Sequence, residues 1–174
     1  MRTPTEEFDV PALSAALHEQ RRARGLTWAQ AAREMSAAFA GTRASPISPS
    51  TLTGLPARGA IDADGVLQML LWLGRSPESF VPGRREEPRD DERLPRVGPD
   101  RILRLDTTAL HRALDGRRAE SGMTWTGVAR EIGGLQAAAL TRLAKGGRIG
   151  IRDAMRILAW LGRPAAGFTR AAEW

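Results

Sequence analysis

The segment GMTWTGVAREI at residues 122–132 closely matches an earlier segment, GLTWAQAAREM, at residues 25–35, and this repeat indicates how the chain is organised. Identical Gly, Thr, Trp, Ala, Arg and Glu residues occupy matching places in the two segments. The match extends upstream at a constant offset of 97 residues, which aligns Asp9 with Asp106. A sequence that repeats in this way predicts two structural units of the same design.

The second half of each copy matches at a shorter offset of 88 residues, which aligns Trp72 with Trp160. The drop from 97 to 88 means that the first copy carries nine additional residues, which fall between Met35 and Ser50. Each copy is about 70 to 80 residues long, and a chain of that length can bury a small core of its own.

The segment between the copies, residues 83–104, differs from both in composition. It mixes arginine with aspartate and glutamate, contains three prolines and has few apolar residues. Such a composition is typical of a linker without its own core. We therefore predict a first domain at residues 1–82, with the insertion at about 36–47, a linker that lets the copies reorient, and a second domain at residues 105–174.

The charge of the chain lies mainly in its second copy. The net charge is +6, and every basic residue except Lys145 is arginine. Residues 105–174 contain 11 basic and 6 acidic side chains, whereas residues 1–82 contain eight of each. This distribution gives the second copy a modest electrostatic preference for a polyanion and gives the first copy none.

Composition also argues against several classes of function. The chain contains no cysteine, and its two histidines, His18 and His111, have no partner carboxylates at metal-ligand spacing. We therefore expect no metal site, no cofactor and no enzymatic activity. No apolar run approaches the roughly 18 residues of a membrane span, and the start lacks an apolar leader. We expect a cytoplasmic protein that does not bind membranes.

Capping and termination signals predict four main helices in each copy, and no segment has a strand pattern. Asp9 can cap a helix that Gly25 ends, since glycine readily adopts the left-handed conformation. Thr27 begins the second helix, and Gln30 three residues later completes a capping box. The insertion at residues 36–47 then either prolongs this helix or forms a long turn.

The third and fourth helices have equally clear signals. Ser48 begins the third helix of the first copy, because serine followed by proline is a strong start signal. The fourth helices, at residues 62–73 and 151–161, are so densely apolar that we expect them at the centre of each core. Trp72 and Trp160 are interpreted as core residues for the same reason.

The order and spacing of these elements match a known pattern in both copies. The residues that carry the match are Thr27, Ala32, Met35, Ile47, Ser48, Leu52, Thr53, Leu55 and Gly59, and Thr124, Ala129, Ile132, Gly134, Leu135, Leu140, Thr141, Leu143 and Gly147. On these residues the chain resembles the lambda-repressor-like (Cro and XRE type) helix-turn-helix family. The resemblance implies an all-α fold of two tandem helix-turn-helix domains, each with about five short helices, in a bacterial, nucleoid-associated transcription regulator, typically a repressor.

The resemblance further implies that the third helix of each copy enters the major groove of double-stranded DNA. In the second copy Gln136 can bond adenine, Arg142 can reach guanine or a phosphate, and Ala137 or Ala138 can contact a thymine methyl group. The other second-copy residues assigned to DNA are Arg130, Thr141, Lys145 and Arg148. Those of the first copy are Ser48, Ser50, Thr51 and Thr53, with Arg33, Arg43 and Arg58 as phosphate ligands.

Several of these residues have a plainer interpretation. Ser48 and Gln136 are equally well explained as helix caps, and Arg142 as a solvated residue. Trp28 and Trp125 replace the glutamine with which the family contacts a phosphate, and we interpret both as packing residues. The neutral first copy also favours a second hypothesis, in which one or both copies dock a protein, as an antitoxin-like or phage-related module or a homodimer would.

Overall fold

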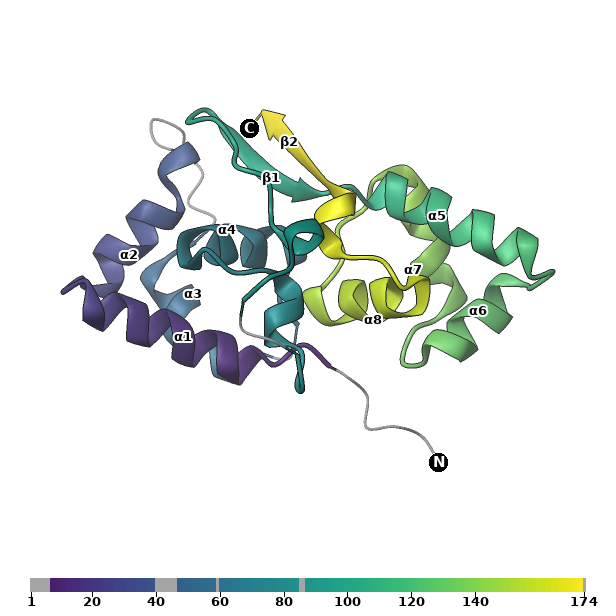
Figure 1. Ribbon diagram of the computed structural model, residues 1–174, viewed down its shortest axis with the longest axis horizontal. Helices are drawn as coiled ribbons and strands as arrows, with labels where there is room; N and C mark the ends of the chain where they lie inside the picture. The colour runs from purple at the N-terminus through teal and green to yellow at the C-terminus, as the bar shows by residue number, and fades with distance from the viewer. Residues whose placement is uncertain (1–6, 40–46, 59, 85–86, 174) are drawn as a thin grey trace.

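The computed structural model describes residues 7–39, 47–58, 60–84 and 87–173. It is mostly helical, with a small two-stranded antiparallel sheet (Figure 1). The helical architecture confirms the sequence prediction, and the sheet corrects the expectation that the chain has no strands. None of the helices in the described residues has the length and apolarity that a membrane span requires.

The first copy folds in the predicted order. Its helices are α1 (Val10–Ala23), α2 (Trp28–Met35), α3 (Pro49–Thr53) and α4 (Ala63–Leu73), with short 3-10 turns η1 (Ala37–Phe39), η2 (Leu55–Ala57) and η3 (Pro77–Phe80). The predicted third helix is thus split, because its second half tightens into η2. The split leaves α3 only five residues long.

The predicted caps form at both ends of these helices. Asp9 Oδ1 accepts a hydrogen bond from the Ala12 amide at 2.9 Å. Thr27 and Gln30 form the reciprocal capping box, with distances of 3.1 and 2.8 Å between the bonded atoms. Gly74 ends α4 at a φ of 68°, a conformation that side chains with a Cβ disfavour. These local signals therefore place the starts of α1 and α2 and the end of α4 correctly.

The second copy repeats this order and adds the sheet. Its helices are α5 (Thr107–Glu120), α6 (Trp125–Ile132), α7 (Ala137–Arg142) and α8 (Ile151–Leu161), with turns η5 (Leu143–Lys145) and η6 (Ala165–Phe168). The strands are β1 (Arg101–Leu105) and β2 (Thr169–Glu173), and the turn η4 (Asp90–Glu92) lies in the predicted linker. The two strands therefore enclose the second copy in the sequence.

The sheet arises where the end of the chain returns to the end of the linker. β1 pairs with β2 in antiparallel register, with Leu103 opposite Ala171. Leu103 and Leu105 are buried, and β1 packs against α4 of the first copy. Each strand is only five residues long, which is too short for an alternation of apolar and polar residues to indicate a strand. Each strand also needs the other as its hydrogen-bonding partner, and the two are far apart in the sequence.

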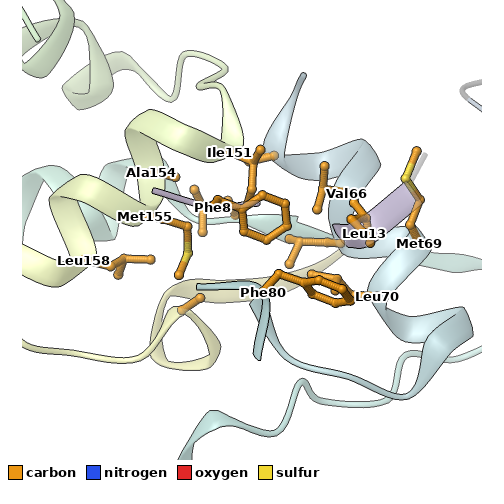
Figure 2. Close-up of a cluster of buried hydrophobic side chains, with 14 of the residues drawn as sticks. Phe8, Leu13, Val66, Met69, Leu70, Phe80, Ile151, Ala154, Met155 and Leu158 are labelled. Carbon is orange, nitrogen blue, oxygen red and sulfur yellow. The ribbon is translucent and has the colours of Figure 1, made fainter. Parts of the chain in front are cut away.

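The two copies share one hydrophobic core. α4 and α8 contact each other, and buried side chains of both copies belong to one continuous cluster. Figure 2 shows Phe8, Val66 and Leu70 of the first copy in this cluster with Ile151 and Met155 of the second. The linker was expected to let the copies reorient, but in the structure they are packed together.

The described part of the insertion forms a turn rather than a longer helix. α2 ends at Met35, and the 3-10 turn η1 follows at once. The chain is described again from Ile47, which is buried and accepts a hydrogen bond from Ser36 Oγ at 3.3 Å through its carbonyl oxygen. Residues 40–46 of the insertion lie outside the described residues.

Trp72 and Trp160 lie at the edge of the core, half-buried, rather than at its centre. The indole N–H of Trp72 donates to Glu34 at 2.7 Å, and that of Trp160 donates to Glu131 at 2.9 Å. The bond from Trp72 lowers the pKa of Glu34, and Arg24 adds to this effect. The prediction that both tryptophans are core residues is therefore wrong in this respect, because the polar edge of an indole needs a partner.

Glu78 is the buried acid that joins the ends of the two copies. Its Oε1 accepts a hydrogen bond from the Ala165 amide at 2.6 Å, while its Oε2 is buried with no hydrogen-bond partner among the described residues. Burial raises the pKa of Glu78 above its ordinary value of 4.5. The folded state therefore binds the Glu78 proton more tightly than the unfolded state does, and stability falls as the pH rises through the folded pKa.

We expect Glu78→Gln to raise the melting temperature at pH 7, because glutamine keeps the oxygen that Ala165 needs and removes the buried charge. The gain should be on the order of 1 kcal/mol. It should shrink as the pH falls, because the raised pKa of Glu78 lets the wild-type carboxyl take up its proton in the folded protein before a free carboxyl would. Thermal melts of both proteins across this range measure the difference, and a glutamine variant less stable at pH 7 would contradict the assignment.

Candidate functional site

The helix α7 has one face buried against the second copy and one face exposed. Leu140 and Leu143 are buried, and α7 packs against α6 through the core side of the second copy. Its remaining face carries the residues that the sequence assigned to DNA. Gln136, Ala138, Thr141 and Arg142 are exposed, and Ala137 is half-buried.

Gln136 stands at the N-cap position of α7 but does not cap the helix. Its backbone is extended, with a φ of −101° and a ψ of 150°, and its side chain makes no capping hydrogen bond. The plain interpretation of Gln136 as a cap is therefore wrong. An exposed amide at the N-terminal end of a short helix is free to present both its donor and its acceptor to a base edge.

Ser48, the equivalent residue of the first copy, does the opposite. Its Oγ accepts a hydrogen bond from the Thr51 amide at 3.1 Å and lies 2.8 Å from Ser50 Oγ. Thr53 Oγ1 donates to the Pro49 carbonyl oxygen at 3.2 Å. The hydroxyl groups of α3 therefore bond within their own helix, and the interpretation of Ser48 as a cap is confirmed.

The basic candidates of the second copy differ in what they contact. Arg130, Arg142 and Lys145 are exposed, and no ion pair joins them to another described residue. Arg148 is exposed too, but its guanidinium lies 3.4 Å from the Asp62 carboxylate. Arg130, Arg142 and Lys145 are thus the side chains best able to approach a polyanion.

The basic candidates of the first copy are fewer. Arg33 and Arg58 are exposed, at the end of α2 and just after η2. Arg43 lies outside the described residues. Glu34, which follows Arg33, accepts a hydrogen bond from the Trp72 indole and is therefore not a free surface charge.

Trp28 and Trp125 occupy the first position of α2 and α6 and pack as interpreted from the sequence. Both are half-buried against the core. The guanidinium of Arg21 lies 4.7 Å from the centre of the Trp28 ring, and that of Arg118 lies 5.2 Å from the Trp125 ring. A cation over an indole face is stabilising, and it holds the turn before the second helix in place.

Arg21 and Arg118 are residues whose role the sequence did not reveal. Arg21 also donates to the Leu26 carbonyl oxygen at 2.7 Å, and Arg118 donates to that of Met123 at 3.0 Å. Each arginine therefore fixes the turn between the first two helices of its copy. Their identity at equivalent positions of the repeat was the available signal, although it did not indicate which atoms they bind.

The two copies thus present unequal surfaces at their third helices. α7 offers a free amide, a free guanidinium and a nearby lysine, whereas α3 offers short hydroxyl groups that are already bonded internally. Such a surface can read hydrogen-bonding groups on base edges and neutralise phosphates, mainly through the second copy.

Comparison with known proteins gives no family to which these features can be assigned. No protein-family model matches the chain, and no significant match occurs among the curated proteins or among the solved structures.

Proposed function

We propose that the protein is a sequence-specific regulator of transcription, in the simplest case a repressor, that binds double-stranded DNA. Each copy acts as a lambda-repressor-like helix-turn-helix domain, with α3 and α7 as the helices that enter the major groove. The proposal keeps the domain limits predicted from the sequence, with residues 83–104 between the two DNA-reading units.

The observation that carries the proposal is the exposed face of α7. Gln136 is exposed at the N-terminal end of this helix without capping it, and Arg142 is exposed at the other end. Glutamine and arginine are the side chains that make bidentate contacts with adenine and guanine. Lys145 and Arg130 are placed on the same copy and can contact phosphates, which position a protein on the duplex.

The weaker first copy gains from being on the same chain as the second. When one unit has bound, the other is held at a high effective concentration near the same duplex. Two units that each bind DNA weakly can then give tight binding by the whole chain. α3 need not be basic for the whole protein to bind tightly.

A second function remains open for the first copy, because the α3 hydroxyl groups are bonded internally and residues 1–82 carry no net charge. In this alternative the first copy docks a protein partner. Binding measured for the full chain distinguishes the two, since DNA contact by both copies protects two adjacent major-groove segments and contact by one copy protects a single segment.

The proposal is tested by selecting bound sequences from a random duplex pool with the full chain at moderate salt. We expect enrichment of a defined sequence, which the protein should bind about 1,000-fold or more tightly than random duplexes. If no sequence is enriched, the proposal is wrong and a protein partner becomes the better explanation.

Lys145→Gln and Arg130→Gln should each weaken binding to all sequences to a similar extent. A plot of the logarithm of the association constant against the logarithm of the salt concentration has a negative slope. If each residue contacts a phosphate, each substitution should make this slope less steep by about one. The slope is measured by titration of the selected duplex at several salt concentrations. A substitution that changes sequence preference and leaves the slope unchanged would mean that the residue contacts bases instead.

A further inference from the structure

Equivalent residues of the two copies meet each other across their contact. Asp62 and Gly150, which match at the offset of 88 residues, form an isolated antiparallel bridge. The Ala63 amide donates to the Ile149 carbonyl oxygen at 2.9 Å, and the Ile151 amide donates to that of Ile61 at 2.8 Å. Ala63 is equivalent to Ile151, and Ile61 is equivalent to Ile149, so the two hydrogen bonds are equivalent to each other. The bridge therefore has a local twofold axis.

A second pair of contacts is similar but is shifted by one residue, because Leu103 matches Glu6, the neighbour of Glu7, at the offset of 97. Gln68 on α4 donates to the Leu103 carbonyl oxygen at 2.7 Å, just before the first helix of the second copy. Arg156, the equivalent of Gln68 on α8, forms an ion pair with Glu7, just before the first helix of the first copy. Each core helix thus holds the segment that precedes the first helix of the other copy.

The residues directly before the two capping aspartates also reach the other copy, although through different kinds of contact. The Leu105 amide donates to Asp64 on α4 at 2.9 Å. Phe8 is the equivalent of Leu105, and it lies in the buried cluster that includes Ile151 and Met155 of α8 (Figure 2). The leading segment of each copy therefore contacts the other copy, in addition to its own last turn, where the Asp9 and Asp106 amides donate to the Phe80 and Phe168 carbonyl oxygens.

The arrangement of the helices agrees with these contacts. In Figure 1 α1 and α5 lie at opposite corners of the molecule, at lower left and upper right, and α2 and α6 occupy the other two corners. A rotation of half a turn within the plane of the view exchanges the two sets. A simple translation, which would relate direct repeats, does not.

We infer that a single chain reads two inverted half-sites of different sequence at one fixed spacing, and that it does so as a monomer. The inference rests on the proposed function. Twofold-related reading helices impose inverted half-sites on a duplex, because the duplex backbone has a dyad of its own. The half-sites differ because α3 and α7 differ at almost every exposed position.

The fixed spacing follows from where the copies touch. Ile61 and Asp62, which follow η2, meet Ile149 and Gly150, which follow η5, at the bridge. Arg148 and Asp62 form an ion pair across this contact. The reading helices are therefore joined through bonded backbone and a shared core, in which Leu103 of β1 also takes part.

The first test uses the wild-type chain and the two-part duplex that it selects. Inserting about five base pairs, half a helical turn, between the half-sites should weaken binding by roughly 100-fold, since only one unit can then bind. A chain whose units reorient would tolerate this insertion with less than about a tenfold loss. Sedimentation of the complex should show one chain on each duplex, and two chains would also overturn the inference.

The second test makes the half-sites identical. Residues 48–57 are replaced by the sequence of residues 136–145, which includes Ser48→Gln and Gly54→Arg, so that both units carry the surface of α7. This variant should select an inverted repeat of the half-site that the second copy reads. Selection of a direct repeat would overturn the inference. A melting experiment shows whether the variant is folded, and the spacing test decides the question if it is not.

The outcomes separate the inference from the proposed function. If the wild-type chain selects no sequence, the proposed function fails, and the inference fails with it. If it selects a two-part site and tolerates the added base pairs, the function stands and the inference is wrong. A duplex with one half-site replaced by random sequence provides the matched control for binding by a single unit.

Discussion

Replacing Gln136 and Arg142 together with alanine is expected to abolish specific DNA binding while the fold survives. Each bidentate contact with a base contributes about 1 to 3 kcal/mol of discrimination, so losing both should weaken binding to the selected duplex by more than about 30-fold. Both side chains are exposed, and neither takes part in a cap or an ion pair among the described residues. The free energy of unfolding should therefore change by less than about 0.5 kcal/mol.

The control for this variant must remove the same charge from a different surface. Arg112→Ala serves, because Arg112 is exposed on α5 and its loss lowers the net charge by the same amount. Its effect should be small and independent of sequence. Specific binding that persists in the double variant, measured as the ratio of dissociation constants for selected and random duplexes, would show that α7 is not the reading helix.

Phe8→Ala is expected to destabilise both copies at once. The side chain is 1% exposed, and its ring centre lies 5.9 Å from that of Phe80. Removing a buried phenyl ring leaves a cavity and typically costs about 3 to 5 kcal/mol. Because Phe8 belongs to the first copy and packs in the cluster that contains α8, the loss should lower the stability of both copies equally.

Amide hydrogen exchange in α1 and in α8 measures this coupling. Both helices should lose protection by the same factor, and denaturant unfolding should remain a single transition. Thr126→Ala, an exposed change on α6, is the control and should alter stability by less than about 0.5 kcal/mol. An α8 that keeps its wild-type protection in Phe8→Ala would mean that the copies are independent domains.

Local signals were sufficient to predict the helices. Asp9, Thr27 and Ser48 cap helices where the sequence indicated, and Gly74 and Gly162 end the core helices in the left-handed conformation. These signals act within one turn of helix, so a single segment contains all the information that they need. The repeat added a second, independent example of each element.

Features that depend on contacts between distant segments were not predictable in this way. β1 and β2 are each five residues long, and they become strands only because they meet. The shared core depends on Phe8, Leu103 and Leu105 packing on the opposite copy, and the sequence of a Pro-containing charged linker gives no sign of that. The backbone pairing of Asp62 with Gly150 also could not be predicted from the identities of these residues.

The candidate site shows the same division. The sequence located α7 and its exposed residues, because Leu140 and Leu143 mark the buried side of the helix. It did not separate Ser48 from Gln136, since both residue types occur at the start of helices. The difference lies in the hydrogen bonds: Ser48 Oγ accepts from the Thr51 amide, and the Gln136 side chain makes no capping hydrogen bond.

The most direct test of the account is to map the amide groups that respond when the full chain binds a duplex. In nuclear magnetic resonance spectra we expect the largest shifts at residues 48–54 and 136–145, which contain both proposed reading helices, and small shifts in η4 and β2. Changes concentrated in η4 or β2, or no response to duplex DNA at low salt, would contradict the assignment of α3 and α7 as reading helices.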